Sequence, residues 1–341
     1  MAKTAVRVGD FSCAAGALQK GYLLVGYERD GSEIRVPTLL MNGAHDGPTL
    51  YLGALIHGNE LAGIEVIRRV MRERVDPGQL SGAVIAVPIQ NPLAYRASTM
   101  LSMEDGLNAN RIFPGDPQET LTNRIVAALS EHAIAQSDYV VDFHCNQVGS
   151  ILFNFTRWED SDTGRANVEM SRAFGFTTVL SQPKRHGFNF EERLVGLLAD
   201  TALAEKKPCI TVELTATHNW EEPAISAGVT GTLNLLRHLH MLPGDLEPQD
   251  PSLPIIKDIL GPQLRVTPDR GGLVHPVEPV GTWVSEGQVL VLIRDPWGDV
   301  VEEVRSPADG YVLAYPHHGN HAAVSGDLVV FVAPRFTGAV H

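Results

Sequence analysis

Two ionisable residues, His57 and Glu60, stand three positions apart where the pattern of apolar residues changes. A short apolar run over 51–56 is typical of a buried strand, and the apolar residues of 61–71 recur at helical spacing. An imidazole and a carboxylate in the turn between a strand and a helix can bind one divalent cation, because zinc accepts both ligand types. In the alternative interpretation His57 only ends the strand, and Glu60 is an acid favoured by the helix dipole.

His144 and Glu213 occupy comparable positions, since each is the last residue of a predicted strand. Parallel strands of an open α/β sheet place their carboxyl ends at one edge, so these side chains are expected to meet His57 and Glu60 there. Two histidines and a glutamate are a familiar ligand set for catalytic zinc. The sequence therefore predicts one Zn²⁺ per chain on His57, Glu60 and His144, with Glu213 as the base that activates water. A hydrogen-bonded core histidine and a paired structural carboxylate are the alternatives for His144 and Glu213.

Further candidates lie beside this set. Asp142 shares a strand face with His144 and is expected to orient its imidazole, unless it is an ordinary surface acid. In the long loop over 90–116, Asn110 and Arg111 stand side by side among turn residues. An arginine offers a planar fork of donors to a carboxylate, so the pair predicts a substrate contact. The alternative for Arg111 is an ion pair with a surface acid.

The elements that must position these residues alternate over 46–240, which predicts an α/β domain with a largely parallel, covered sheet. Two β-like runs before them, joined by a turn at 29–32, predict an antiparallel opening to this sheet. Five prolines in 243–262 indicate a linker, and the short strands beyond it predict a small all-β domain. We expect domains at 1–242 and 263–341. The predicted strands are 22–27, 34–41, 51–56, 83–88, 138–144, 150–155, 177–181 and 208–213, and the predicted helices are 61–71, 117–135, 162–174, 191–203 and 222–239.

Composition excludes several classes of function. A formal net charge of -13, without a basic run, argues against nucleic acid and anionic membrane partners. Three cysteines without a C-x-x-C spacing predict neither a disulfide framework nor a thiolate zinc site. We find no membrane-spanning apolar run and no apolar segment of a signal peptide near the first residue, so we expect a cytoplasmic protein.

Five sequence blocks in order resemble the succinylglutamate desuccinylase/aspartoacylase family of zinc carboxypeptidase-like hydrolases. These blocks are His57-Gly-Asn-Glu60, Asn91-Pro-Leu-Ala, the stretch from Asn108 to Gly115, Asp142-Phe-His144 and Val212-Glu213. The resemblance implies a phosphorylase/hydrolase-like α/β/α sandwich, the zinc ligands and base named above, and a substrate carboxylate held by Asn110 and Arg111. It also implies hydrolysis of the amide bond of a small N-acyl amino acid, and some relatives deacetylate N-acetyl-2,4-diaminobutyrate.

One position departs from the family pattern. Many relatives carry an arginine that polarises the scissile carbonyl where this chain has Met100. Arg96 is one candidate to replace that cation, and losing a preorganised donor typically costs on the order of 10²–10³ in rate. A catalytically silent ligand-binding homologue therefore stays open as an alternative. A carboxypeptidase acting on peptides also stays open, because the same metal ligands serve both activities. The chain is also a possible homo-oligomer.

The predicted all-β domain resembles a biotinyl/lipoyl-like barrel. Those carriers attach their cofactor to a lysine, and no lysine follows Lys257. A swinging-arm carrier is therefore excluded. A structural role, or a gating role with Tyr311 or His317 reaching the cleft, is the hypothesis that remains for this part of the chain.

Overall fold

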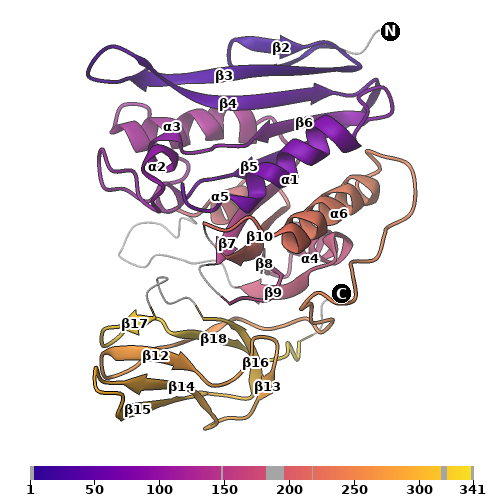
Figure 1. The fold of residues 1–341 in the computed structure, drawn as a ribbon. Helices are drawn as coiled ribbons and strands as arrows, with labels where there is room; N and C mark the ends of the chain where they lie inside the picture. Colours follow the sequence, from indigo (N-terminus) through magenta and orange to yellow (C-terminus); the bar gives the residue numbers. More distant parts are fainter. Residues whose placement is uncertain (1–3, 147–148, 182–195, 217, 316–320, 339–341) are drawn as a thin grey trace.

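A mixed eight-stranded sheet forms the centre of the molecule, in the order β3-β4-β6-β5-β7-β10-β8-β9 (Figure 1). The computed structural model describes residues 4–146, 149–181, 196–216, 218–315 and 321–338. The strands of this sheet are β3 (Ala17–Tyr27), β4 (Glu33–Asn42), β5 (His45–Ala54), β6 (Ser81–Val87), β7 (Tyr139–Asn146), β8 (Phe153–Arg157), β9 (Thr177–Ser181) and β10 (Cys209–Ala216). A short hairpin, β1 (Val6–Val8) and β2 (Phe11–Cys13), precedes them.

The middle of the sheet is parallel, since β6, β5, β7 and β10 run in one direction. On one side β3 pairs antiparallel with β4, and β4 with β6; on the other side β8 pairs antiparallel with β10 but parallel with β9. The antiparallel opening predicted for the first two strands is confirmed, whereas the largely parallel sheet predicted over 46–240 is wrong at β8 and β9, which run against the central strands. The physical reason at β8 is the chain length: six residues separate it from β7, too few for the helical crossover that a parallel return needs.

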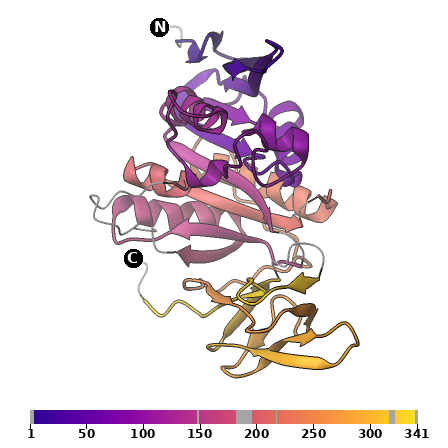
Figure 2. The same cartoon turned by 90° about the vertical axis from the view of Figure 1, so that its left-hand side faces the viewer.

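Helices cover both faces of the sheet, which gives three layers (Figure 2). One apolar cluster joins the sheet to α1, α4 and α6, and a second joins it to α3 and α5. Side chains alternate along β7, so that Val141 and Phe143 enter the first cluster and Val140 enters the second. The helices are α1 (Ala62–Arg69), α2 (Pro92–Ala97), α3 (Leu121–Leu129), α4 (Asp162–Phe174), α5 (Leu198–Ala204) and α6 (Glu222–His238).

Most predicted elements form, with shifted ends. Two helices finish in a π-helical turn, η1 (Val70–Arg74) after α1 and η3 (Ser130–Ile134) after α3. The strand predicted over 150–155 begins only at Phe153, because Ser150 instead bridges to Ala314. Of the helix predicted over 191–203, residues 191–195 lie outside the described residues, and α5 begins at Leu198.

The C-terminal part consists of two four-stranded antiparallel sheets, β11-β18-β16-β13 and β15-β14-β12-β17. Apolar residues fill the space between them, and another cluster joins Phe331 and Leu313 to Phe153 beneath the main sheet. The strands are β11 (Leu264–Val266), β12 (Gly272–Pro276), β13 (Trp283–Val284), β14 (Val289–Arg294), β15 (Val300–Arg305), β16 (Gly310–Ala314), β17 (Ala322–Ala323) and β18 (Val330–Ala333).

The gating hypothesis gains no support from the described side chains. Tyr311 donates a hydrogen bond from its hydroxyl to Asp258 Oδ2 at 3.2 Å, within the predicted linker, and Arg335 stacks over its ring. His317 lies outside the described residues. Tyr311 therefore anchors the C-terminal sheets to the chain segment that precedes them.

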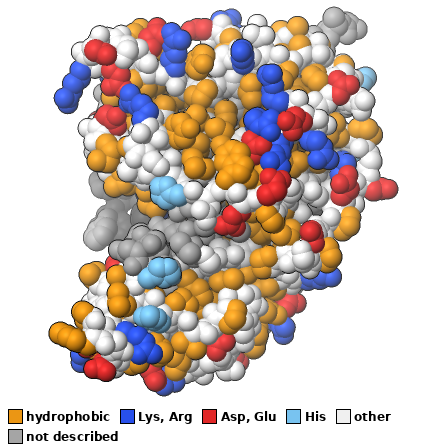
Figure 3. Space-filling view, viewed as in Figure 1, with side chains coloured by type: hydrophobic (Ala, Val, Ile, Leu, Met, Phe, Trp, Pro, Cys, Tyr) orange, Lys and Arg blue, Asp and Glu red, His pale blue; other side chains and the backbone are white. Residues whose placement is uncertain are grey.

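Acidic and basic side chains are interspersed on the face shown in Figure 3. The arginines near the end of α1 are paired, since Arg68 contacts Glu65 and Glu73 and Arg69 contacts Glu65 and Glu222. Within the part of the chain that the structure describes, no helix is long and apolar enough to cross a membrane. The three cysteines are all buried and free, as their spacing predicts.

Candidate metal centre

The turn between β5 and α1 carries His57 and Glu60 into the protein, where they are 6% and 4% exposed. The backbone bends at Leu55, whose φ of 55° is left-handed. Gly58 then packs directly on α2, and a Cβ there would lie 2.1 Å from the carbonyl carbon and oxygen of Ala94. Any larger residue at Gly58 would displace this turn and both ionisable side chains with it.

His144 joins this pair from β7, as the strand-end argument predicts. Glu60 lies between the two imidazoles: its Oε1 is 2.8 Å from His57 Nδ1, and its Oε2 is 2.9 Å from His144 Nδ1. One ligand atom from each of the three residues lies within 4.8 Å of the others. The rings meet edge to face, with their centroids 5.1 Å apart.

The opposite nitrogen of each imidazole is also held. His57 Nε2 lies 3.1 Å from Asn108 Oδ1, and His144 Nε2 lies 2.8 Å from Asp142 Oδ2. Because both partners are oxygen acceptors, each ring keeps its proton on Nε2 and can present the lone pair of Nδ1 to a cation. Asp142 thus makes the predicted contact with His144. The contact of Asn108 with His57 was not predicted from the sequence, although Asn108 begins one of the five blocks that resemble the family.

The donor set fits a divalent cation. Glu60 Oε2 is buried, and its contact with His144 Nδ1 at 2.9 Å requires a proton on that nitrogen. A metal ion held by both groups would supply, in place of that proton, the positive charge that a buried carboxylate needs. Two imidazole nitrogens and a carboxylate are ligands that zinc accepts in catalytic sites.

Charges within the group shift its proton affinities in the metal-free protein. Burial by itself raises the pKa of Glu60, but the adjacent His57 and His144 outweigh this effect and lower that pKa to about 2. Burial lowers the pKa of His144, yet the Asp142 and Glu60 carboxylates reverse this and hold it well above the usual value. A metal ion that binds here must therefore displace a proton from His144.

Glu213 faces the same space from the neighbouring strand. In the parallel pairing of β10 with β7 it stands directly beside His144, and it is 8% exposed. Within the described part of the chain its carboxylate has no hydrogen-bond or ion-pair partner. Burial is the largest reason that its pKa rises to about 8, with further increases from Glu60 and Asp142 and a partial offset from His144. An unpaired carboxylate of high proton affinity beside a cation site suits a general base.

This raised pKa predicts how the stability of the metal-free protein depends on pH. Below about pH 4.5 Glu213 is protonated in the folded and unfolded states alike, but between 4.5 and 8 only the unfolded state ionises. Stability should therefore fall as pH rises through this window, and Glu213→Gln should abolish that part of the loss. Thermal unfolding with chelator at pH 5.5 and 8.5 would measure it.

The exposed Glu169 on α4 provides the control for this measurement. Glu169→Gln should follow the wild-type pH dependence. An equal loss of stability between the two pH values in wild-type protein and in Glu213→Gln would show that Glu213 is not the responsible group.

Asn110 and Arg111 lie at the short helical turn η2 (Ala109–Arg111), close to this group but with different environments. Asn110 is buried: its Oδ1 accepts a hydrogen bond from Leu198 N at 3.0 Å, and its Nδ2 lies 3.3 Å from His144 Nε2. Its side chain therefore links the loop to the start of α5 and lies beside a metal ligand, and its contact with the substrate stays a prediction.

Arg111 is more exposed than its neighbour and has no carboxylate partner among the described residues. Its Nη1 donates to the carbonyl oxygen of Asn110 at 2.6 Å. Partial burial, together with repulsion from Arg157, lowers the pKa of this guanidinium, while Asp200 and Glu60 partly offset the effect. Its remaining donors have no partner among the described residues, and within that part of the chain they can receive an anion.

Arg96 does not offer a comparable group. Its Nη2 lies 2.5 Å from Glu28 Oε1 and 3.1 Å from Glu104 Oε1, and its side chain is 53% exposed. These two acids hold the guanidinium, so the expectation that Arg96 replaces the arginine missing at Met100 gains no support. These ion pairs connect α2 to the β3–β4 hairpin, through Glu28, and to the loop after α2, through Glu104.

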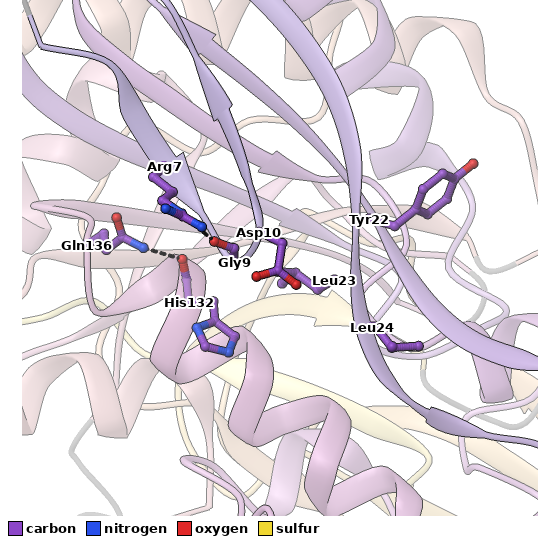
Figure 4. Close-up of a pocket in the computed structure, with 8 residues that line it drawn as sticks. All are labelled: Arg7, Gly9, Asp10, Tyr22, Leu23, Leu24, His132 and Gln136. Atoms are coloured by element: carbon purple, nitrogen blue, oxygen red, sulfur yellow. Dashed lines mark hydrogen bonds between the residues drawn. The ribbon is translucent and has the colours of Figure 1, made fainter.

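A separate hollow of about 310 Å³ lies between the N-terminal strands and η3 (Figure 4). It is lined by polar and apolar side chains that include Arg7, Tyr22 and His132, and by none of the predicted site residues. Arg7 and Gln136 already bond to the backbone at Gly9 and His132. This hollow brings together no set of groups suited to catalysis.

Comparison with known proteins gives matches over most of the chain. Residues 46–239 match the succinylglutamate desuccinylase/aspartoacylase catalytic domain. The chain is 27% identical over 331 residues to N-alpha-acetyl-L-2,4-diaminobutyric acid deacetylase of Halomonas elongata, covering 94% of this chain and 92% of that protein. It is 30% identical over 172 residues to succinylglutamate desuccinylase of Pseudomonas paraeruginosa, covering 47% of this chain and 51% of that one.

Solved structures share the fold. A succinylglutamate desuccinylase/aspartoacylase of Rhodobacter sphaeroides superposes with a TM-score of 0.82 at 23% identity, covering 94% of this chain and 96% of that one. The product-bound ectoine utilization protein EutE (DoeB) of Ruegeria pomeroyi gives 0.81 at 23% identity, covering 93% and 95%. These likenesses confirm the predicted zinc carboxypeptidase-like α/β/α fold with its small C-terminal β part.

Proposed function

Since the chain belongs to the succinylglutamate desuccinylase/aspartoacylase family, we propose that it is a zinc-dependent hydrolase of the amide bond of a small N-acyl amino acid or related N-acylated amine. One observation carries the proposal: Nδ1 of His57, Nδ1 of His144 and the Glu60 carboxylate surround one point, and Glu213 stands beside it. Both carboxylate oxygens of Glu60 face a histidine nitrogen, at 2.8 and 2.9 Å, so the three residues present a compact set of ligands.

The residues divide the chemistry between them. A zinc ion bound by His57, Glu60 and His144 would supply Lewis acidity to the acyl carbonyl and to a water molecule. Glu213 would take a proton from the attacking water on a carboxylate oxygen and deliver it to the leaving nitrogen. Burial disfavours the ionised form of this carboxyl, as its pKa of about 8 in the metal-free protein indicates, and so helps it to hold the proton until the amide bond breaks.

Arg111 is the group that we assign to the substrate carboxylate. Its guanidinium is charged and has no carboxylate partner among the described residues, and it follows directly on Asn110, which contacts His144. A planar fork of donors at this position can bind the carboxylate of an amino acid in a fixed orientation. The amide bond of the same molecule would then lie toward the metal ligands.

A short acyl group is the favoured substrate feature. The match to the deacetylase extends over 94% of this chain and so includes the C-terminal sheets, whereas the match to the desuccinylase covers 47%. We therefore place N-acetyl amino acids, including acetylated diamino acids, before N-succinyl ones. Domain boundaries at 242/243 and 262/263, a cytoplasmic location, a homo-oligomeric state and the lack of a nucleic acid partner remain predictions from the sequence.

Free amine release from a panel of N-acetyl, N-succinyl and N-formyl amino acids tests this function with zinc-loaded protein. We expect acetylated amino acids to be cleaved and their C-terminal carboxamides, which lack the anion for Arg111, to be cleaved at least tenfold more slowly, since hydrogen bonds to charged groups contribute roughly 1.5–3 kcal/mol. Rapid cleavage of long peptides, or no cleavage of any acylated amino acid, would contradict the proposal.

A further inference from the structure

A continuous chain of hydrogen bonds runs from the metal centre into the core. Asp142, whose Oδ2 lies 2.8 Å from His144 Nε2, accepts on Oδ1 a hydrogen bond from Gln90 Nε2 at 2.8 Å. Gln90 in turn accepts on Oε1 from the Tyr51 hydroxyl at 2.9 Å. Among the described residues, neither Tyr51 nor Gln90 makes a hydrogen bond to the proposed metal ligands, so the hydrogen-bonded route from both leads through Asp142.

The arrangement is fully buried and tightly enclosed. Tyr51 and Gln90 are each 0% exposed, and Asp142 is 1% exposed. The Gln90 amide fills a notch over Gly53, where a Cβ would lie 2.7 Å from the amide carbon and nitrogen. The Gln90 backbone is also fixed, because its N–H donates to the carbonyl oxygen of Ala54 at 2.9 Å. The side-chain amide therefore has little freedom to move away from Asp142.

The direction of these hydrogen bonds determines how Asp142 is held. The Tyr51 hydroxyl donates to the side-chain oxygen of Gln90, and this fixes the side-chain amide so that its N–H₂ group faces Asp142. Asp142 then receives one donor on each oxygen, from Gln90 and from His144. A carboxylate held in this way keeps the His144 proton on Nε2 and the Nδ1 lone pair directed at the metal position.

We propose that Tyr51 and Gln90 are positioning residues of the metal centre, which hold Asp142 in the orientation that presents His144 Nδ1 to the metal. This inference rests on the proposed zinc site. A purely structural reason for a buried tyrosine, amide and carboxylate in series is weak, since apolar side chains of the same volume fill such a space without the cost of desolvating polar groups.

Zinc affinity is the quantity that separates positioning from simple packing. It would be measured by competition with a chromophoric chelator for wild-type protein, Tyr51→Phe and Gln90→Met. Loss of an outer partner of a metal ligand typically weakens metal binding by about 10–100-fold, so we expect about tenfold for Gln90→Met and a smaller loss for Tyr51→Phe. The visible spectrum of the cobalt-substituted protein should change in both variants, because the geometry of His144 changes.

Tyr315→Phe is the matched control. Tyr315 is also buried, and its hydroxyl donates to the carbonyl oxygen of Glu278 in the C-terminal part. This variant loses a buried hydroxyl of the same kind, and should therefore lose stability without any change in zinc affinity or in the cobalt spectrum. Tyr51→Phe removes a single oxygen and is therefore expected to fold. It keeps the proposal testable if Gln90→Met does not fold.

A double variant tests whether the effect passes through Asp142. In an Asp142→Asn background, Tyr51→Phe should weaken zinc binding by less than it does in the wild-type background. Equal losses in both backgrounds, or zinc affinities of Tyr51→Phe and Gln90→Met within twofold of wild type, would overturn the positioning role. If wild-type protein nevertheless binds zinc and hydrolyses acylated amino acids, the proposed function stands, whereas a wild-type protein that binds no zinc would overturn both.

Discussion

Glu213→Gln is expected to lower kcat by about 10²–10⁴-fold while one zinc ion remains bound, which is the range typical of a lost general base. Glutamine has nearly the same shape as glutamate, but its amide cannot accept a proton from water near neutral pH. Because Glu213 makes no hydrogen bond or ion pair within the described residues, its replacement should leave the metal ligands in place. Turnover of the best substrate from the panel and metal content of the same sample would be measured together.

The outcome distinguishes a base from a residue that only shapes the site. KM should change little in Glu213→Gln, because no substrate-binding group has been removed. Glu169→Gln again serves as the control and should keep wild-type turnover. A kcat for Glu213→Gln within tenfold of wild type, at full zinc occupancy, would show that another group activates the water.

Removal of a metal ligand should abolish both zinc binding and activity. For His144→Ala we expect zinc content to fall from about one ion per chain to below a tenth, with turnover near background, since two of three protein ligands cannot complete a catalytic site. Chelation of the wild-type protein should have the same effect on activity, and added zinc should restore only the wild type. Metal analysis and amine release before and after chelation would measure these changes.

The control for this experiment is His275→Ala, which replaces an exposed histidine on β12 in the C-terminal part. It should keep full zinc content and activity. Retention of stoichiometric zinc by both His57→Ala and His144→Ala would place the metal elsewhere. Full activity of the chelated, metal-free protein would exclude a catalytic metal altogether.

Several features of this site follow from local sequence patterns alone. The change from a strand pattern to a helical pattern placed His57 and Glu60 at a turn, and the ends of two further apolar runs placed His144 and Glu213 at strand termini. Side chains of β-strands alternate with a period of two, so Asp142 had to share a face with His144. Because parallel strands end at a common edge, these positions were enough to predict that the four residues meet.

Other features depend on contacts between distant parts of the chain, which no local pattern encodes. The sequence could not show that Glu28 and Glu104 hold Arg96, or that Asn110 is engaged by α5, since each contact joins separate elements. By contrast, the antiparallel direction of β8 had a signal in the sequence, because only six residues connect it to β7 and a parallel return needs a longer crossover.

The support of the metal ligands was hidden for the same reason. Asn108, Gln90 and Tyr51 contact the site, or the residues that hold it, across 51, 52 and 39 positions of sequence. Residue types and spacing thus determined which side chains form the candidate centre. The tertiary structure alone decided their hydrogen-bond partners and the high pKa of Glu213, because both arise from burial and from charges that folding brings together.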